Sequence, residues 1–135
     1  ENNKIENIQL LISQYYDLYQ KSSNDENTLI YYNDMASFFM KTKEYNEAIN
    51  YFSKMREIIE ENGIKDKKSY VYICFREGLC YKETNEIQES YNKIISAVKY
   101  IDYIEDPKDK GKIYQEFATL NISLLLNLFL CFQFR

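Results

Sequence analysis

The sequence predicts an all-α protein built from stacked antiparallel helical hairpins. Apolar residues recur at spacings of three and four along most of the chain, which is the pattern of amphipathic helices. The 135 residues include only 3 glycines and 1 proline, too few turn residues for a many-stranded sandwich or barrel. Similar segments also return at intervals of about 40 residues, as expected of stacked helical units. We therefore expect residues 1–135 to form one helical domain.

The N-terminal segment is predicted to be a helix with an apolar stripe that must pack against another element. The members of this stripe are Ile5, Ile8, Ile12, Tyr15 and Tyr19. A polar stretch follows from 21 to 27, and Asn24 or Asp25 is expected to start the next helix because both are good N-caps.

Capping and turn residues divide the rest of the chain into five further helices. Gly63 is a natural C-terminal stop, Asp66 offers an N-cap, and Asp106-Pro107 places a capping carboxylate just before a proline. The expected helices cover about 26–42, 45–61, 66–83, 86–104 and a last segment that begins near 107.

An internal repeat is the most informative feature of the sequence. The segment 32–38 reads almost type for type like 114–120, and the segment 74–80 falls between them. A fixed period of this size implies stacked supersecondary units. The small residues of the three segments are Ala36, Gly78 and Ala118. The expected units are about 27–61, 66–104 and 108–134, the last of them incomplete.

These units resemble the tetratricopeptide repeat family over about residues 27–121. The family's first helix carries a large residue, a large-small pair and an aromatic residue, and Tyr32, Met35-Ala36 and Phe39 fill those places. The second unit departs from the pattern, with Cys74 and Glu77 where larger apolar residues are usual. The resemblance implies a right-handed array of helical hairpins that binds a peptide or protein ligand and has no enzymatic activity.

Long, irregular repeats in a chain rich in Tyr, Asn, Ile and Lys also look like the repeat domains of bacterial Rap, NprR and PlcR-type regulators. This narrower resemblance implies a ligand-sensing domain for short signalling peptides in quorum sensing and transcription regulation. Two alternatives stay open. One is a helper domain that engages a response regulator and promotes its dephosphorylation, and the other is a purely structural scaffold segment.

The resemblance also implies a binding groove, because the first helices of such hairpins line the concave face. Asn33, Arg76 and Gln115 would then reach a peptide backbone or a carboxylate. The alternative is that these are ordinary solvated positions. The family's carboxylate clamp is not reproduced, since Asn33 and Ser37 stand where Lys and Asn are required. The polar groove candidates are Asn33, Ser37, Lys41, Arg76, Lys82 and Gln115; Met40, Phe75, Leu79 and Thr119 are expected beside them.

Composition argues against several functional classes. A formal net charge of −4 gives no electrostatic footprint for nucleic acid, which requires clustered Lys and Arg. The chain has no His and 3 Cys, so the usual zinc ligand sets cannot be assembled, and no cofactor is expected. Cys74, Cys80 and Cys131 are expected to be reduced, buried thiols of a cytoplasmic protein.

The two ends of the chain also suggest expectations. The chain starts at Glu1 without Met or a charged-then-apolar leader, so we expect no signal peptide and a fragment of a longer protein. The apolar stretch 122–134 is shorter than the ~20 residues that span a bilayer, which argues against a membrane segment. We expect this tail to continue the last helix and pair with a second copy as a homodimer. A membrane-associated tail and an abnormal C-terminus from truncation or a shifted frame are the alternatives.

Overall fold

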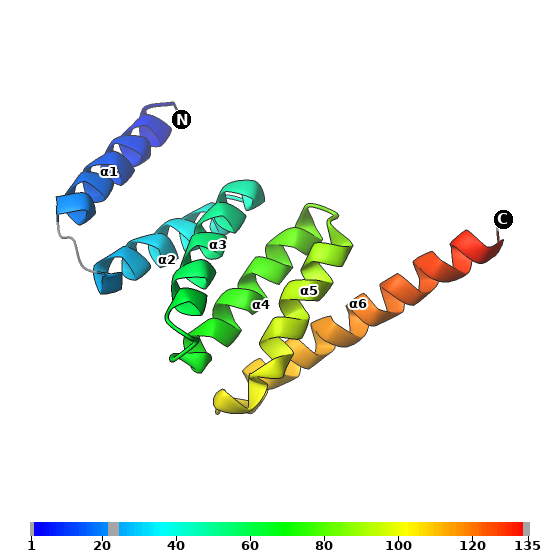
Figure 1. Ribbon diagram of the computed structural model, residues 1–135. Coiled ribbons are helices and arrows are strands. Elements are labelled where there is room, and N and C mark those ends of the chain that lie inside the picture. Colours follow the sequence, from blue (N-terminus) through cyan, green and yellow to red (C-terminus); the bar gives the residue numbers. More distant parts are fainter. Residues whose placement is uncertain (1, 22–24, 134–135) are drawn as a thin grey trace.

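The computed structural model describes residues 2–21 and 25–133, and it contains no strand within those ranges. The prediction of an all-α protein is confirmed (Figure 1). The elements in order are α1 (Asn2–Lys21), α2 (Asp25–Lys41), α3 (Tyr45–Glu61), α4 (Lys67–Glu83), α5 (Ile87–Lys99), the 3-10 turn η1 (Ile101–Tyr103) and α6 (Pro107–Gln133).

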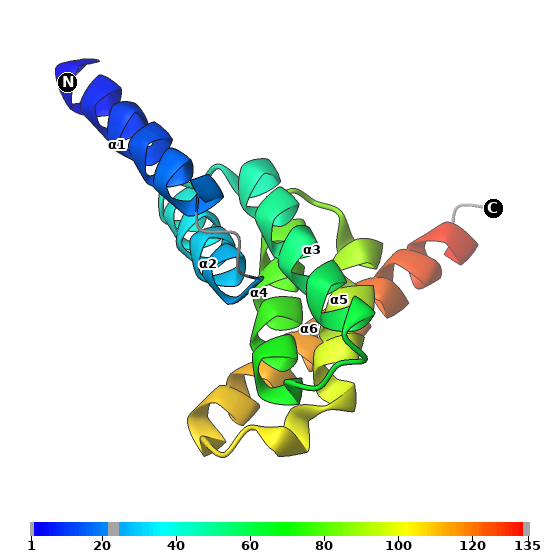
Figure 2. The same ribbon diagram turned by 60° about the vertical axis from the view of Figure 1, so that its left-hand side comes forward.

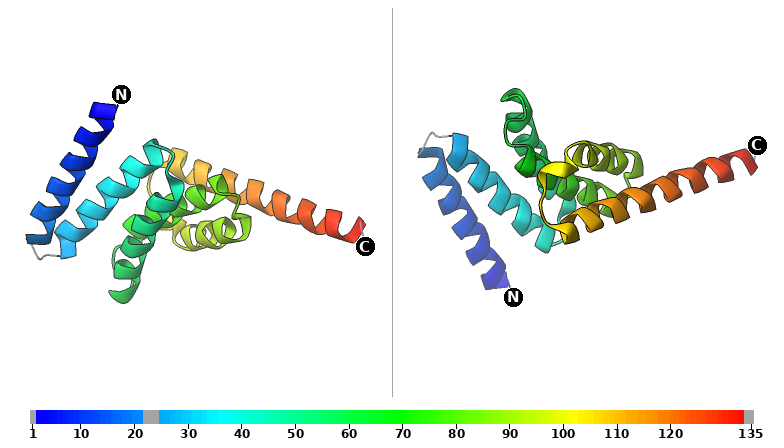
Figure 3. Two further views of the ribbon diagram at one scale, coloured as in Figure 1. Left: turned by 90° about the horizontal axis from the view of Figure 1, so that it is seen from above. Right: turned by 90° about the horizontal axis from the view of Figure 1, so that it is seen from below.

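Helices that are consecutive in the sequence pack against each other from α2 to α6 (Figure 1). α2 and α3 form one hairpin, α4 and α5 form a second, and α3 also packs against α4. α1 makes far fewer contacts, chiefly with α2, and lies alongside it at one end of the array (Figure 2). The C-terminal half of α6 projects from the opposite end (Figure 3). α3 therefore contacts both α2 and α4 in the middle of the molecule.

The same turn closes both hairpins, 42 residues apart in the sequence. The turns are Thr42-Lys43-Glu44 and Thr84-Asn85-Glu86, and the central residue of each has φ of 61°. In each turn the glutamate amide donates to a carbonyl five residues back, at 2.8 Å and 2.9 Å. The threonine hydroxyl donates to that glutamate's carboxylate, at 2.8 Å and 2.7 Å. These backward bonds satisfy carbonyls at the helix end and fix the reversal of the chain.

Small residues allow the two helices of each hairpin to approach closely. Ala36 and Ala48 are fully buried between α2 and α3. In the second hairpin, a Cβ added to Gly78 would lie 2.7 Å from Cδ1 of Ile94. The Ser90 hydroxyl donates to the Gly78 carbonyl at 2.7 Å, which satisfies a buried polar group at this contact.

The helix expected over 86–104 is shorter in the structure. α5 ends at Lys99, and η1 follows. Ile101 in η1 and Ile104, which follows it with an extended backbone, are both buried, at 4% and 1% exposed. Burial of these two isoleucines explains why the α-helix does not continue.

α6 runs without a break to Gln133, so the expectation that the tail continues the last helix is confirmed. Its N-terminal half buries Ile113 and Leu120, whereas every residue from 125 to 133 is exposed. It is the single helix in the described ranges that is long and apolar enough to cross a membrane. Residues 122–134 alone are too short to span a bilayer, but α6 has 27 residues, so the expectation against a membrane segment has no support from its length. The exposed apolar side chains are Ile122, Leu125, Leu126, Leu128, Phe129, Leu130 and Phe132.

Two further expectations concern side chains. Cys74 and Cys80 are buried free thiols as expected, but Cys131 is exposed because it lies in the projecting half of α6. In the predicted stripe of α1, Ile8, Ile12 and Tyr15 are half-buried, and the side chains of Ile5 and Tyr19 lie outside the described part of the structure.

Candidate functional site

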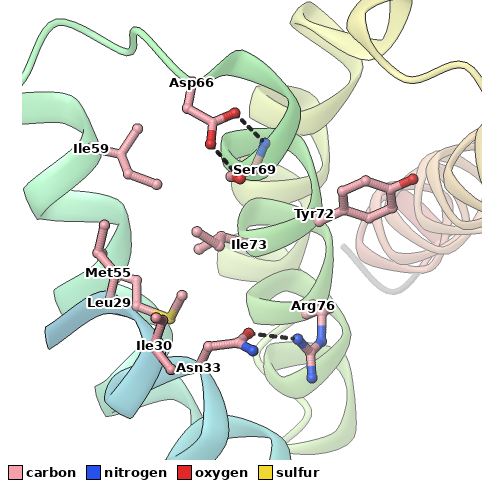
Figure 4. Close-up of a pocket in the computed structure, with 10 residues that line it drawn as sticks. All are labelled: Leu29, Ile30, Asn33, Met55, Ile59, Asp66, Ser69, Tyr72, Ile73 and Arg76. Carbon is pink, nitrogen blue, oxygen red and sulfur yellow. Dashed lines mark hydrogen bonds between the residues drawn. The ribbon is translucent and has the colours of Figure 1, made fainter. Parts of the chain in front are cut away.

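Arg76 lies at the centre of a groove between α2 and α4. Its Nη1 donates to Oδ1 of Asn33 at 3.2 Å, and its Nη2 donates to Oγ of Ser37 at 2.7 Å. Figure 4 shows the Asn33 and Arg76 side chains pointing toward each other from the two helices. The guanidinium carbon stands 4.9 Å from the ring centroid of Phe52, which is fully buried on α3. Side chains from two other helices, α2 and α3, therefore hold the Arg76 side chain of α4.

Helical spacing accounts for the arrangement. Asn33 and Ser37 are one turn apart on α2, so both face α4 and both reach the same guanidinium. A flat aromatic face beneath the guanidinium supports a cation without competing for its N–H groups. The sequence-predicted candidates Asn33, Ser37 and Arg76 thus form one cluster.

None of the residues that the structure describes gives Arg76 an acidic partner. No carboxylate of the described residues lies within ion-pair distance of its guanidinium, and both of its hydrogen-bond acceptors are neutral. Burial lowers the pKa of Arg76 from its usual value, because a cation removed from water is disfavoured. An arginine remains protonated even so. The groove therefore carries a partly desolvated positive charge that the described residues do not neutralise.

Two hollows flank this cation along the groove. The first, of about 370 Å³, is predominantly apolar, with Ile30 of α2, Met55 and Ile59 of α3 and Ile73 of α4 in its wall (Figure 4). The second, of about 420 Å³, lies toward the C-terminal ends of α2 and α4. Its walls contain the predicted candidates Ser37, Met40, Lys41 and Leu79, together with Tyr45 and Glu83. Among the described residues, Arg76 alone lines both hollows.

The other predicted candidates lie away from the Arg76 cluster. The Lys82 ammonium pairs with Glu116 of α6 at 2.8 Å. Nearer the start of α4, the Tyr72 hydroxyl donates to Asp109 of α6 at 2.7 Å. That hydrogen bond raises the pKa of Tyr72 to about 12. These bonds tie α4 to α6. Gln115 is exposed and lines neither hollow.

A buried ion pair beside the groove was not predicted from the sequence. Glu77 has no exposed surface, and its carboxylate accepts hydrogen bonds from Arg56 Nε at 2.9 Å and from Ser53 Oγ at 2.8 Å. Arg56 also bonds Glu60, and these two carboxylates raise the pKa of Arg56 despite the opposing effect of burial. Glu77 stands where the resemblance implied an apolar residue. Its charge is neutralised by Arg56, and this ion pair joins α3 to α4.

The apolar wall of the first hollow was also missed. The helical spacing that singled out Asn33 and Arg76 reaches Ile30 and Ile73 one turn earlier on the same two helix faces. Extending the predicted stripe toward the N-termini of the helices would have found them.

Comparisons with protein-family models, with curated proteins and with solved structures found no match.

Proposed function

We propose that this chain binds an extended polypeptide segment in the groove between α2 and α4, as a repeat domain of tetratricopeptide type. The observation that carries the proposal is the Arg76 cluster, a positive charge held between two hollows that no carboxylate of the described residues neutralises. Structural arginines are normally neutralised, as Arg56 is by Glu77 and Glu60. An unneutralised arginine in a groove is suited to recognition.

The groove has the composition of a peptide site. Apolar walls in the first hollow accept a side chain, while Asn33, Ser37 and Arg76 supply polar groups that a peptide backbone can share. Between α4 and α6, by contrast, Tyr72 bonds Asp109 and Lys82 bonds Glu116, so these polar side chains of α4 are already engaged. The proposed site therefore belongs to the first two hairpins.

The repeated turns and the small residues at the hairpin contacts support the tetratricopeptide-like part of the proposal. Two hairpins with the same closing hydrogen bonds 42 residues apart form a structural repeat. Such a domain would serve as the ligand-sensing or interaction part of a regulatory protein.

Selection of peptides from a random phage-displayed library tests the proposal. The tightest peptide is then titrated calorimetrically into the wild-type chain and into the double variant Asn33→Ala/Arg76→Ala. We expect the double variant to bind at least about tenfold more weakly, because it loses the charged donor and one of the groups that orient it.

The variant Lys99→Gln is a matched control, since it removes one positive charge from α5 and lines neither hollow. It should bind like the wild type. Equal affinity of the wild type and the double variant would place the site elsewhere.

The exposed half of α6 leads us to propose a second contact, with another copy of the same chain. No charged residue occurs between Asn121 and Gln133, so two such helices meet without burying a charge. The seven exposed apolar side chains lie close together along this half of α6, and contiguous exposed apolar patches mark protein–protein contacts.

A further inference from the structure

We propose that the polypeptide bound in this groove is anchored by an internal Asp or Glu side chain, whose carboxylate pairs with Arg76 between the two hollows. This inference rests on the proposed function and names the chemistry of its ligand. The geometry of the cluster, the charges around it and the position of the hollows each support it.

The guanidinium is already oriented for a carboxylate. Asn33 and Ser37 each accept one N–H bond, and the Phe52 ring supports the plane from below. Five N–H donors are present in an arginine, so donors remain after these two bonds. A carboxylate accepts two parallel N–H bonds in this plane, which is stronger and more directional than a contact with a neutral amide.

The acidic groups that line the hollows do not provide this partner. Asp66 lies at the far end of the first hollow, where it caps α4 by accepting bonds from the backbone and hydroxyl of Ser69. Glu83 lines the second hollow, two turns along α4 from Arg76, and forms no ion pair with it. Lys41 in the same wall adds a second positive charge. The centre of the groove therefore favours a negative group from the ligand.

The position of Arg76 favours a side chain over a chain terminus. A peptide that ended at Arg76 would fill one hollow and leave the other empty. A peptide that continues past Arg76 fills both, with an apolar residue in the first hollow on one side of the acid. An acidic residue within the peptide satisfies both the charge and the space.

A positional-scanning array of heptapeptides tests this inference. Every peptide is acetylated and amidated, the fourth residue is fixed as each amino acid in turn, and the others are randomised. Wild-type protein should give signals for Asp and Glu at least about tenfold above those for Asn and Gln, the scale of a charge-assisted hydrogen bond.

The variant Arg76→Gln should lose this preference, whereas Lys99→Gln should retain it. Glutamine keeps an NH₂ group that can still donate to Asn33 and Ser37, and an unchanged circular-dichroism melting curve verifies that the fold is intact. A second array with free C-termini and no fixed acid examines terminal anchoring.

The outcomes separate the two proposals. Binding without preference for an acid overturns the anchor and leaves the peptide groove standing. Strong signals in the free-terminus array alone overturn the internal position of the acid. Absence of binding in both arrays overturns the groove itself, and the anchor with it.

Discussion

Arg56 Nε lies 2.9 Å from Oε2 of Glu77, and this pair joins α3 to α4 behind the groove. Arg76 immediately precedes Glu77 on α4, yet it forms no ion pair with any carboxylate of the described residues. Removing one partner of a buried ion pair leaves an uncompensated charge. We expect Arg56→Met to lower the free energy of unfolding by about 3 kcal/mol, measured by urea denaturation.

Arg76→Met is the matched comparison and should change the free energy of unfolding by less than about 1 kcal/mol. This variant loses two hydrogen bonds to neutral groups but also removes a partly buried cation that the fold does not neutralise. Equal losses in the two variants would show that Arg76 is a structural residue like Arg56.

Gly78→Ala should destabilise the second hairpin. The added Cβ would lie 2.7 Å and 2.9 Å from two atoms of Ile94, which is fully buried, and 3.3 Å from the Ser90 carbonyl oxygen. Overpacking of this kind costs ~1–3 kcal/mol, which exceeds the gain in helix propensity of up to ~1 kcal/mol.

Gly111→Ala provides the control because nothing lies within 4 Å of its added Cβ in the first turns of α6. It should raise the free energy of unfolding by about 0.5–1 kcal/mol through helix propensity alone, and the thermal midpoint should rise accordingly. If Gly78→Ala and Gly111→Ala shifted the thermal midpoint in the same direction, the close approach of Gly78 to Ile94 would be disproved.

Asp66→Ala should cost about 1 kcal/mol at neutral pH through loss of the α4 N-cap. Hydrogen bonds from the hydroxyl and the amide of Ser69 lower the pKa of Asp66 in the folded state. The stability that the ionised Asp66 adds to the folded state is therefore present above the unfolded pKa of about 4. It is lost as pH falls through the lower folded pKa.

The difference in stability between wild type and Asp66→Ala should accordingly narrow in urea titrations below about pH 4. Asp66→Ser supplies a neutral cap, so its advantage over Asp66→Ala should not change with pH. A difference for the wild type that is constant from neutral to acid pH would contradict the account of this cap.

Deletion of residues 122–135 should convert a dimer into a monomer, because it removes the exposed apolar half of α6 and leaves the buried Leu120 in place. Light scattering should give the full chain twice its mass of 16.3 kDa and the shortened chain its monomer mass. A monomeric full chain at micromolar concentration would refute the dimer, and flotation of that chain with phosphatidylcholine vesicles would assign the helix to a membrane surface.

Local sequence signals predicted the helices well. Asp66 and Pro107 mark the starts of α4 and α6 within a residue, because caps act on their own turn. The end of α5 was missed because the burial of Ile101 and Ile104 against other helices decides it. Tertiary contacts also explain why the role of Glu77 was unexpected, since its partner Arg56 lies 21 residues away on another helix.

The candidate site was predicted only in part for a similar reason. Helical spacing placed Asn33, Ser37 and Arg76 on facing surfaces, but the hydrogen bonds between them and the two hollows depend on the gap between α2 and α4. Lys82 had the correct spacing for the groove, yet Glu116 of α6 engages it. A single helix face does not reveal such a partner.

Amide and arginine side-chain NMR spectra of the ¹⁵N-labelled chain, recorded during titration with the tightest displayed peptide, test the central claim most directly. The claim predicts the largest shift changes at Asn33, Ser37 and Arg76, including the Arg76 Nε–H signal, and little change along α5. Changes confined to α5 or α6, with the α2 and α4 signals unmoved, would contradict a binding site between α2 and α4.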